Sequence, residues 1–101
     1  MSSRTDLQTE LEELLGSKNV YFQPPSSTRM KYPAIVFERS GIDNDFANNT
    51  VYNQSFSYSV TVIDQDPDSE IVKKVSQLPK CRWTRHFKKD NLNHDVFTLY
   101  Y

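Results

Sequence analysis

The stretch VYNQSFSYSVTVI, residues 51–63, decides the fold class, because large apolar side chains alternate along it with Asn, Ser and Thr. The apolar set comprises Tyr52, Phe56, Tyr58, Val60 and Val62. Alternation with a period of two marks an extended strand that has one face in a core and one face in contact with water. We therefore predict a long strand over residues 51–63, in a sheet that is covered on one side.

The segments around this strand predict four more strands. AIVFER, residues 34–39, is a nearly continuous β-favouring run that is typical of a central strand. Residues 20–22 form a shorter extended piece. Residues 81–87 and 95–101 predict the last two strands, with a turn-rich connection over residues 88–94.

Residues 40–50 are predicted to form a loop that projects from the domain. They are polar, rich in Asn and Asp, and interrupted by Gly41, which is the composition of a connection rather than of a strand. Ile42 and Phe46 are the large apolar residues of this segment.

The first helix is predicted from the spacing of four leucines. They recur at i, i+4, i+7 and i+8, which forms one apolar stripe along a helix. These residues are Leu7, Leu11, Leu14 and Leu15. Thr5 or Asp6 is the predicted N-cap and Gly16 the predicted end, while residues 1–4 are expected to be disordered.

The second helix is predicted from the turn Asp66-Pro67-Asp68. Asp66 is the expected N-cap and Pro67 the expected first helical residue, because proline fits that position. Pro79 predicts the end of the helix. The apolar stripes of the two helices are expected to form one core layer against the sheet, made of Leu11, Leu15, Ile71, Val75 and Leu78.

Together these elements predict a single α+β domain over residues 1–101. Their order is α-β-β-β-α-β-β, and the connections are too short for several parallel crossovers. A mainly antiparallel sheet with both helices on one face fits this order. The expected architecture is therefore a two-layer sandwich.

Composition and charge argue against several classes of protein. Twelve Lys and Arg residues oppose 13 Asp and Glu residues, so the net charge of -1 supplies no overall attraction to nucleic acid or to anionic membranes. No run approaches the roughly 18 apolar residues of a membrane span, and the N-terminus has no apolar signal core. Cys81 is the only cysteine, so we expect folding in a reducing compartment, the cytoplasm of the producing cell.

The acids around residue 66 resemble the start of a calcium-binding loop. Asp64, Asp66 and Asp68 have the spacing of its first three carboxylates. Ser69 stands where such a loop needs glycine, and Val75 stands where it needs a bidentate glutamate. We therefore assign these acids to helix capping rather than to a metal site.

The remaining reactive side chains predict no catalytic site. His86 and His94 lack the spacing that directs two imidazoles at one metal ion. Cys81 lies in a predicted strand beside Trp83 and is assigned to packing rather than to nucleophilic chemistry. We expect no enzymatic activity, no metal and no cofactor.

Charge is segregated along the chain. Residues 40–72 hold six acids and no base, whereas residues 73–89 hold seven bases and no acid. Complementary charges on two different surfaces of a subunit would steer a head-to-tail contact between copies. We hypothesise that the acidic loop packs near the basic strand of a neighbouring copy, with Ile42 or Phe46 as the apolar anchor. The candidate interface residues are Ile42, Asp43, Asp45, Phe46, Arg82, Arg85, Lys88 and Lys89.

The segment KCRWTRHFKK, residues 80–89, offers an alternative function, a small nucleic-acid-binding or regulatory protein. Bases mixed with aromatic residues can combine phosphate contacts with base stacking. Regular strand alternation would place Arg82, Thr84, His86 and Lys88 on one face and Cys81, Trp83, Arg85 and Phe87 on the other. The aromatic residues would then serve the core and most bases a protein partner, so specific nucleic-acid binding is not expected.

Four segments carry a resemblance to a known family. They are YPAIVFER from Tyr32, SVTVIDQDPDSEI from Ser59, LPKCRW from Leu78 and DNLNHDVFTLYY from Asp90. The chain resembles the tail-terminator or tail-completion proteins of the head-tail connector region in long-tailed phages and prophages of Gram-positive bacteria. The resemblance covers residues 21–101, and Trp83, Lys88 and Lys89 are bulkier and more basic than the family pattern.

The resemblance implies a structural virion protein without enzymatic activity. It implies a homo-oligomeric ring, commonly of six subunits, that caps the tail tube. The implied partners are further copies of the chain, the major tail-tube protein and the head connector proteins. The implied location is the tail of the virion, with assembly in the host cytoplasm. Helices laid on an antiparallel sheet are the fold that the resemblance implies.

Overall fold

The computed structural model describes residues 4–24, 29–47 and 50–100, and within residues 43–55 it describes the backbone alone. The elements are α1 (Arg4–Leu15), β1 (Val20–Phe22), β2 (Ala34–Ala47), β3 (Thr50–Asp64), α2 (Glu70–Ser76), β4 (Cys81–Lys89) and β5 (Leu92–Tyr100). Their order is the predicted α-β-β-β-α-β-β. Arg4 is already helical, whereas the expected disorder of residues 1–3 lies outside the described residues.

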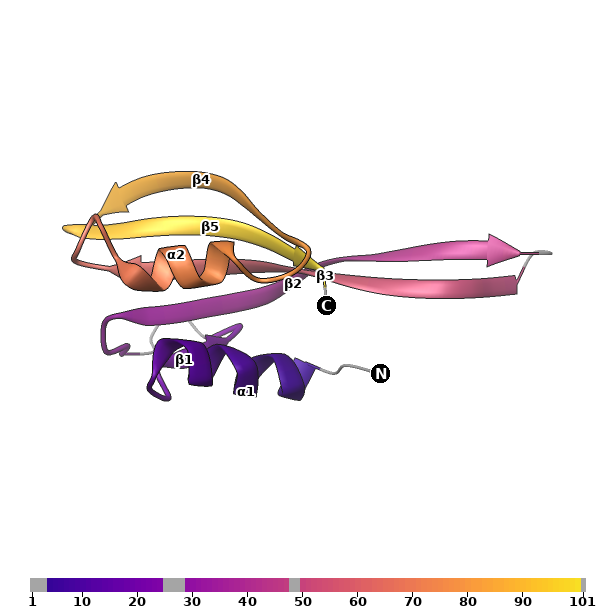
Figure 1. The fold of residues 1–101 in the computed structure, drawn as a ribbon, viewed down its shortest axis with the longest axis horizontal. Coiled ribbons are helices and arrows are strands. Elements are labelled where there is room, and N and C mark those ends of the chain that lie inside the picture. Colours follow the sequence, from indigo (N-terminus) through magenta and orange to yellow (C-terminus); the bar gives the residue numbers. More distant parts are fainter. Residues whose placement is uncertain (1–3, 25–28, 48–49, 101) are drawn as a thin grey trace.

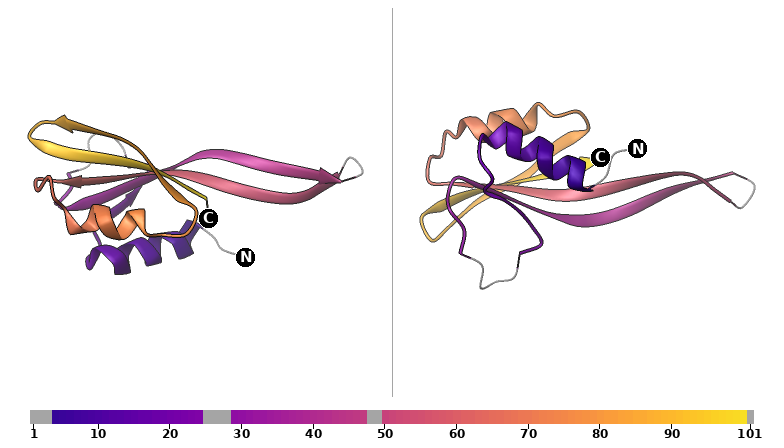
Figure 2. Two further views of the ribbon diagram at one scale, coloured as in Figure 1. Left: turned by 45° about the horizontal axis from the view of Figure 1, so that its top comes forward. Right: turned by 90° about the horizontal axis from the view of Figure 1, so that it is seen from below.

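The five strands form one sheet in the order β1-β2-β3-β5-β4. The short β1 pairs with β2 in parallel, and every other pair of neighbouring strands is antiparallel. Both helices lie against the same face of this sheet (Figures 1 and 2). The predicted α+β sandwich with a mainly antiparallel sheet is therefore confirmed.

The core lies between the helices and the face of the sheet that they cover. Leu7 and Leu11 of α1 and Val75 of α2 are fully buried there. The partly buried Leu15, Ile71 and Leu78 pack against the same cluster, as the helical stripes predict. The sheet contributes Val20, Ile35, Phe37, Tyr58, Val60, Val62, Phe97 and Leu99. The opposite face of the sheet, which we call the far face, carries no helix (Figure 2).

The prediction of a loop at residues 40–50 is wrong for residues 40–47 and 50, whereas residues 48 and 49 lie outside the described residues. β2 continues through this segment to Ala47 and pairs with β3 from Ile42↔Phe56 to Ala47↔Thr50. The long alternating strand needs a backbone partner along its length, and residues 40–47 supply that partner despite their polar side chains.

Both predicted helix starts are also wrong. Thr5 and Asp6 lie inside α1, which begins at Arg4. Asp66 does not cap α2: its carboxylate accepts a hydrogen bond from the backbone N–H of Asp68 at 2.9 Å, which forms a turn before the helix. The N-cap is Ser69, whose hydroxyl accepts from the N–H of Ile71 at 3.2 Å.

Replacing Ser69 by Ala is expected to lower the free energy of unfolding by about 1 kcal/mol, the usual cost of losing an N-cap. Ser69 is buried, so the freed N–H gains no full hydration in compensation. Asp66→Ala is the matched control, and it should cost less because the exposed Asp66 caps only a turn. Urea unfolding followed by circular dichroism measures both variants. A larger loss for Asp66→Ala would contradict the assignment of the cap.

The turn between β4 and β5 is shorter than the predicted connection over residues 88–94. Asp90 and Asn91 alone separate the two strands. Both have positive φ values, 54° and 62°, as a two-residue type I′ hairpin requires. Asp and Asn tolerate this conformation better than other residues with side chains. The two strands are therefore in register over their whole length, apart from one bulge.

Candidate assembly interface

A two-stranded arm extends beyond the two-layer part of the protein. We define the arm as residues 42–47 of β2 and residues 50–56 of β3. β5 accompanies β3 only as far as Ser57↔Tyr100, and β1 accompanies β2 only at residues 35–37. Among the described residues, no third strand and no helix accompanies the arm, which makes the molecule elongated, 51 × 23 × 23 Å (Figure 1).

The root of the arm is fixed by close packing between the two strands. The sheet register shifts between Arg39 and Gly41, and a Cβ atom on Gly41 would lie 3.0 Å from Oγ of Ser57. Ser40 and Ser57 join their hydroxyls at 3.1 Å, and the guanidinium of Arg39 lies 5.3 Å from the ring centre of Phe56. These contacts join the two strands at the root of the arm.

Ile42 is the apolar side chain at the root of the arm, and it is 48% exposed. The other predicted interface residues of this segment are Asp43, Asp45 and Phe46. Their backbones lie in the arm, paired with Ser55, Asn53 and Val51, while their side chains fall outside the described residues.

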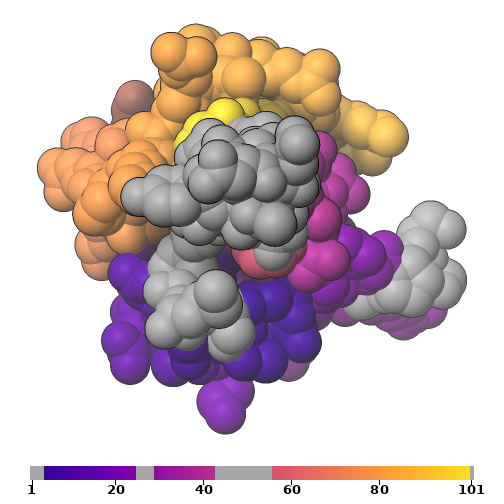
Figure 3. All heavy atoms as spheres, turned by 90° about the vertical axis from the view of Figure 1, so that its right-hand side faces the viewer, coloured from indigo at the N-terminus to yellow at the C-terminus, as the bar shows by residue number. Residues whose placement is uncertain are grey.

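β4 is exposed along nearly its whole length. It is an edge strand of the sheet, and Arg82–Lys89 are all exposed. Viewed along the arm, β4 lies on the opposite side of the molecule from α1 (Figure 3). The expectation that Trp83 and Phe87 serve the core is wrong, because they are 53% and 37% exposed.

A bulge in β4 overturns the predicted division of its faces. Trp83 pairs with Phe97 but Arg85 pairs with Val96, so Thr84 is an extra residue, and its hydroxyl donates to the carbonyl of Val96 at 2.8 Å. One extra residue reverses the faces of all that follow. His86 and Lys88 therefore share the helix-bearing side with Cys81 and Trp83, which are opposite the core residues Leu99 and Phe97.

The bulge gathers bases and aromatic rings on the far face, in a group that we call the basic cluster. It consists of Arg82, Arg85, Phe87 and Lys89 of β4 with His94 of β5. The ring of Phe87 stacks on that of His94, with centroids 4.6 Å apart and planes 13° apart. The guanidinium of Arg85 lies 5.4 Å from the centre of the Phe87 ring. Three of the four predicted basic interface residues thus share one face, and Lys88 lies on the other.

A shallow hollow adjoins the basic cluster. It has a volume of about 520 Å³ and is lined by Lys80, Cys81, Arg82, Thr84, Thr98 and Tyr100. Two bases, two hydroxyl groups and a phenol make this surface a favourable place for acidic and polar side chains. The hollow and the cluster share Arg82, and we call the two together the basic surface.

A polar network occupies the other side of β4 and β5. The indole of Trp83 donates to the carboxylate of Asp95 at 3.3 Å, and a ring nitrogen of His86 lies 3.2 Å from the side-chain oxygen of Asn93. Asn93 in turn donates to the carbonyl of Gln65 at 3.2 Å. Among the described residues, no buried side-chain nitrogen or oxygen lacks a hydrogen-bond partner. The buried polar atoms of this network are therefore satisfied within the protein.

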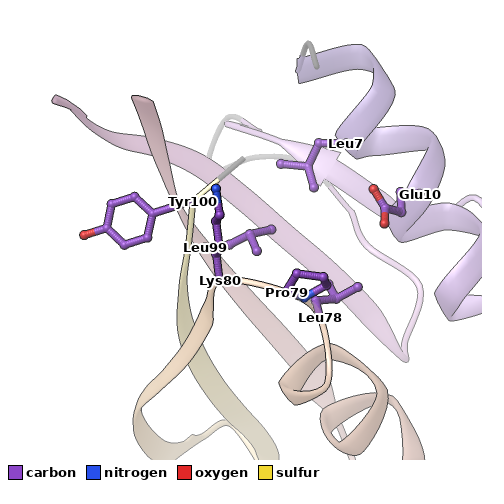
Figure 4. Close-up of a pocket in the computed structure, with 7 residues that line it drawn as sticks. All are labelled: Leu7, Glu10, Leu78, Pro79, Lys80, Leu99 and Tyr100. Carbon is purple, nitrogen blue, oxygen red and sulfur yellow. The ribbon is translucent and has the colours of Figure 1, made fainter. Parts of the chain in front are cut away.

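A second hollow, of about 220 Å³, lies between α1, the connection from α2 to β4 and the end of β5 (Figure 4). Leu7, Leu78 and Leu99 give it an apolar lining, and Glu10 and Lys80 add one charge of each sign. It is smaller than the roughly 300 to 1,000 Å³ of typical small-molecule sites. This hollow therefore suits one apolar side chain better than a cofactor.

The reactive side chains are dispersed or already engaged. Within the described ranges, no three His, Cys, Asp or Glu residues gather in a way that could hold a metal ion. The carboxylate of Asp64 accepts from the N–H of Asp66 at 3.1 Å, so the calcium-like segment builds turns. Burial raises the pKa of the Cys81 thiol, which leaves less of the nucleophilic thiolate at neutral pH.

Neither described helix is long and apolar enough to cross a membrane. The comparisons with known proteins identify no relative: no family model matches the chain, and no curated protein sequence matches it significantly. The geometry of the arm and of the basic surface is therefore the main basis for a functional proposal.

Proposed function

We propose that this protein is a structural subunit that assembles with copies of itself into a closed ring, as a tail-terminator or tail-completion protein of a long-tailed phage or prophage. Its partners would be the major tail-tube protein and the head connector proteins, and its place the virion tail. The resemblance of four sequence segments suggests this role. The single structural observation that supports it best is the two-stranded arm.

We expect an arm of this kind to bind another protein. A two-stranded hairpin is only marginally stable in water, because neither of its faces has a layer to pack on. This arm nevertheless contains apolar residues, among them Ile42, which is 48% exposed at its root. Contact with another protein would cover those residues and would bury the arm's unpaired backbone groups against new partners.

The arm and the exposed β4 also have the arrangement that a ring needs. A ring forms when one surface of each subunit contacts a different surface of the next subunit. The arm leaves the domain at one end, whereas β4 reaches its Lys89 end at the other (Figure 1). One chain therefore cannot place its own arm on that end of its own β4, but a neighbouring copy can supply the arm.

Excision of the arm is expected to abolish self-association while the domain still folds. Gly41 and Ser57 are register partners, so residues 42–56 can be replaced by Asn-Gly, which closes a two-residue hairpin. Sedimentation velocity and negative-stain microscopy would compare this variant with the wild-type protein, which should form closed rings at high concentration. A wild-type chain that stays monomeric at every concentration would refute the proposal.

Ile42→Asp tests the same contact without changing the length of the chain. Ile42 is exposed, so the thermal melt should stay near that of the wild-type protein. Self-association should weaken about tenfold or more, which corresponds to about 1.4 kcal/mol. Unchanged association of both variants would exclude the arm from the interface.

The basic cluster supports a second candidate function, the binding of single-stranded nucleic acid. Arg82, Arg85 and Lys89 share a face with the stacked rings of Phe87 and His94, which is a combination suited to phosphates and bases. Fluorescence anisotropy with a labelled 20-nucleotide oligonucleotide tests it. Binding that weakens steeply as salt rises would favour this candidate, and no binding at low salt would exclude it.

A further inference from the structure

We infer that the basic surface on the far face of β4 and β5 is the docking site for the arm of a second copy of this chain. This inference rests on the proposed ring and names its two contact surfaces. It assigns the contact to the far face, away from the helices.

Charge complementarity identifies the occupant. The arm contains Asp43 and Asp45 and no base, within a segment of 33 residues that has six acids and no base. The basic cluster contributes Arg82, Arg85 and Lys89, and none of the three forms an ion pair with another described residue. Opposite charges on two separate surfaces favour a contact between copies and fix its direction.

An exposed aromatic ring gives the contact an apolar centre. Phe87 is exposed in the centre of the basic cluster. Aromatic rings and arginines in the middle of a contact supply most of its binding energy when water is excluded. The Phe87 ring is already held between Arg85 and His94, so little side-chain freedom would be lost on binding.

The shape of the basic surface agrees with an extended occupant. The hollow beside Arg82 and the stack at Phe87 lie along the same two strands, β4 and β5. An arm of two strands is about 10 Å wide, since neighbouring strands lie about 5 Å apart, and it can follow such a surface. The hydroxyl groups of Thr84 and Thr98 offer further partners to a polar arm.

The test uses two full-length variants with reversed charges. The arm variant carries Asp43→Lys and Asp45→Lys, and the face variant carries Arg85→Glu and Lys89→Glu. Each variant alone would oppose like charges at the contact, so its self-association should be at least about tenfold weaker than that of the wild-type protein. In an equimolar mixture each arm meets a face of opposite charge, so association should return.

A matched control distinguishes the effect of charge reversal on the far face from the effect of the same change in net charge elsewhere on the protein. Lys74→Glu with Lys88→Glu makes the same change of net charge as the face variant, and both residues are exposed. Lys88 even lies on β4, but on the helix-bearing side. This control should associate like the wild-type protein. Equal losses in the control and in the face variant would overturn the inference.

The remaining outcomes distinguish this inference from the proposed ring. A wild-type chain that never associates removes the ring and the docking site together. If arm excision abolishes the rings but the face variant forms them normally, the ring stands and the docking site is wrong. If the equimolar mixture stays monomeric, the two surfaces do not meet. If the face variant loses binding of a labelled oligonucleotide but associates normally, the basic surface serves nucleic acid instead.

Discussion

Replacing Val75 by Asp is expected to abolish the cooperative unfolding transition. Val75 is fully buried between α2 and the sheet, in the same cluster as Leu11 and Phe97. A carboxylate at this position would be buried without a cation to pair with, at a cost of several kcal/mol. A domain of this length has a total stability of about 5 to 15 kcal/mol, so the folded state would be scarcely populated.

Lys74→Asp is the matched control for this prediction, because it introduces the same side chain one position away. Lys74 is exposed and lies in the last turn of α2, so its loss should cost only a few tenths of a kcal/mol through the helix dipole. Thermal unfolding followed by circular dichroism compares the two variants. If Val75→Asp melts cooperatively near the wild-type temperature, the core layer between the helices and the sheet is incorrectly assigned.

The fold class could be predicted from the sequence because two patterns are long and regular. Tyr58, Val60 and Val62 alternate with small polar residues, and all three are in the core. The leucines of α1 follow a helical period, and Leu7 and Leu11 are fully buried. Burial of one whole face is what makes such patterns strict, since a one-residue shift would expose every apolar side chain.

The first strand of the arm could not be predicted because residues 40–47 carry no burial pattern. Half of residues 40–47 are polar and one more is Gly41, and that composition is equally typical of a loop. They form a strand because β3 offers unpaired backbone groups opposite them, which is a property of the partner strand. One signal could have suggested a hairpin: the segment rich in Asn and Asp, residues 40–50, directly precedes a very long alternating strand.

The faces of β4 could not be predicted because a bulge changes the period of the strand. Regular alternation separates Arg82 from Arg85, whereas the extra residue Thr84 brings both to the far face. Local sequence does not mark Thr84 as a bulge, because its neighbours favour a regular strand equally well. The basic cluster is therefore visible only in three dimensions.

Replacing Phe97 or Phe87 by Ala is expected to have very different effects on stability. The two residues lie in neighbouring strands but on opposite faces of the sheet. Phe97 is fully buried against the helices, so Phe97→Ala should leave a cavity and lower the free energy of unfolding by about 3 to 5 kcal/mol. Phe87 is partly exposed and loses mainly its stack with His94, so Phe87→Ala should cost about 1 kcal/mol.

The same substitution at the two positions should therefore separate folding from assembly. Phe97→Ala acts through the stability of each subunit, and any subunit that remains folded keeps its basic surface intact. Phe87→Ala removes the apolar centre of that surface, so it should weaken self-association about tenfold or more while the domain stays folded, as expected of a central aromatic residue in an interface. Urea unfolding and sedimentation velocity measure the two quantities independently. Unaltered association of Phe87→Ala would show that the far face of β4 is not an interface between copies, and a loss of stability as large as that of Phe97→Ala would show that Phe87 belongs to the core.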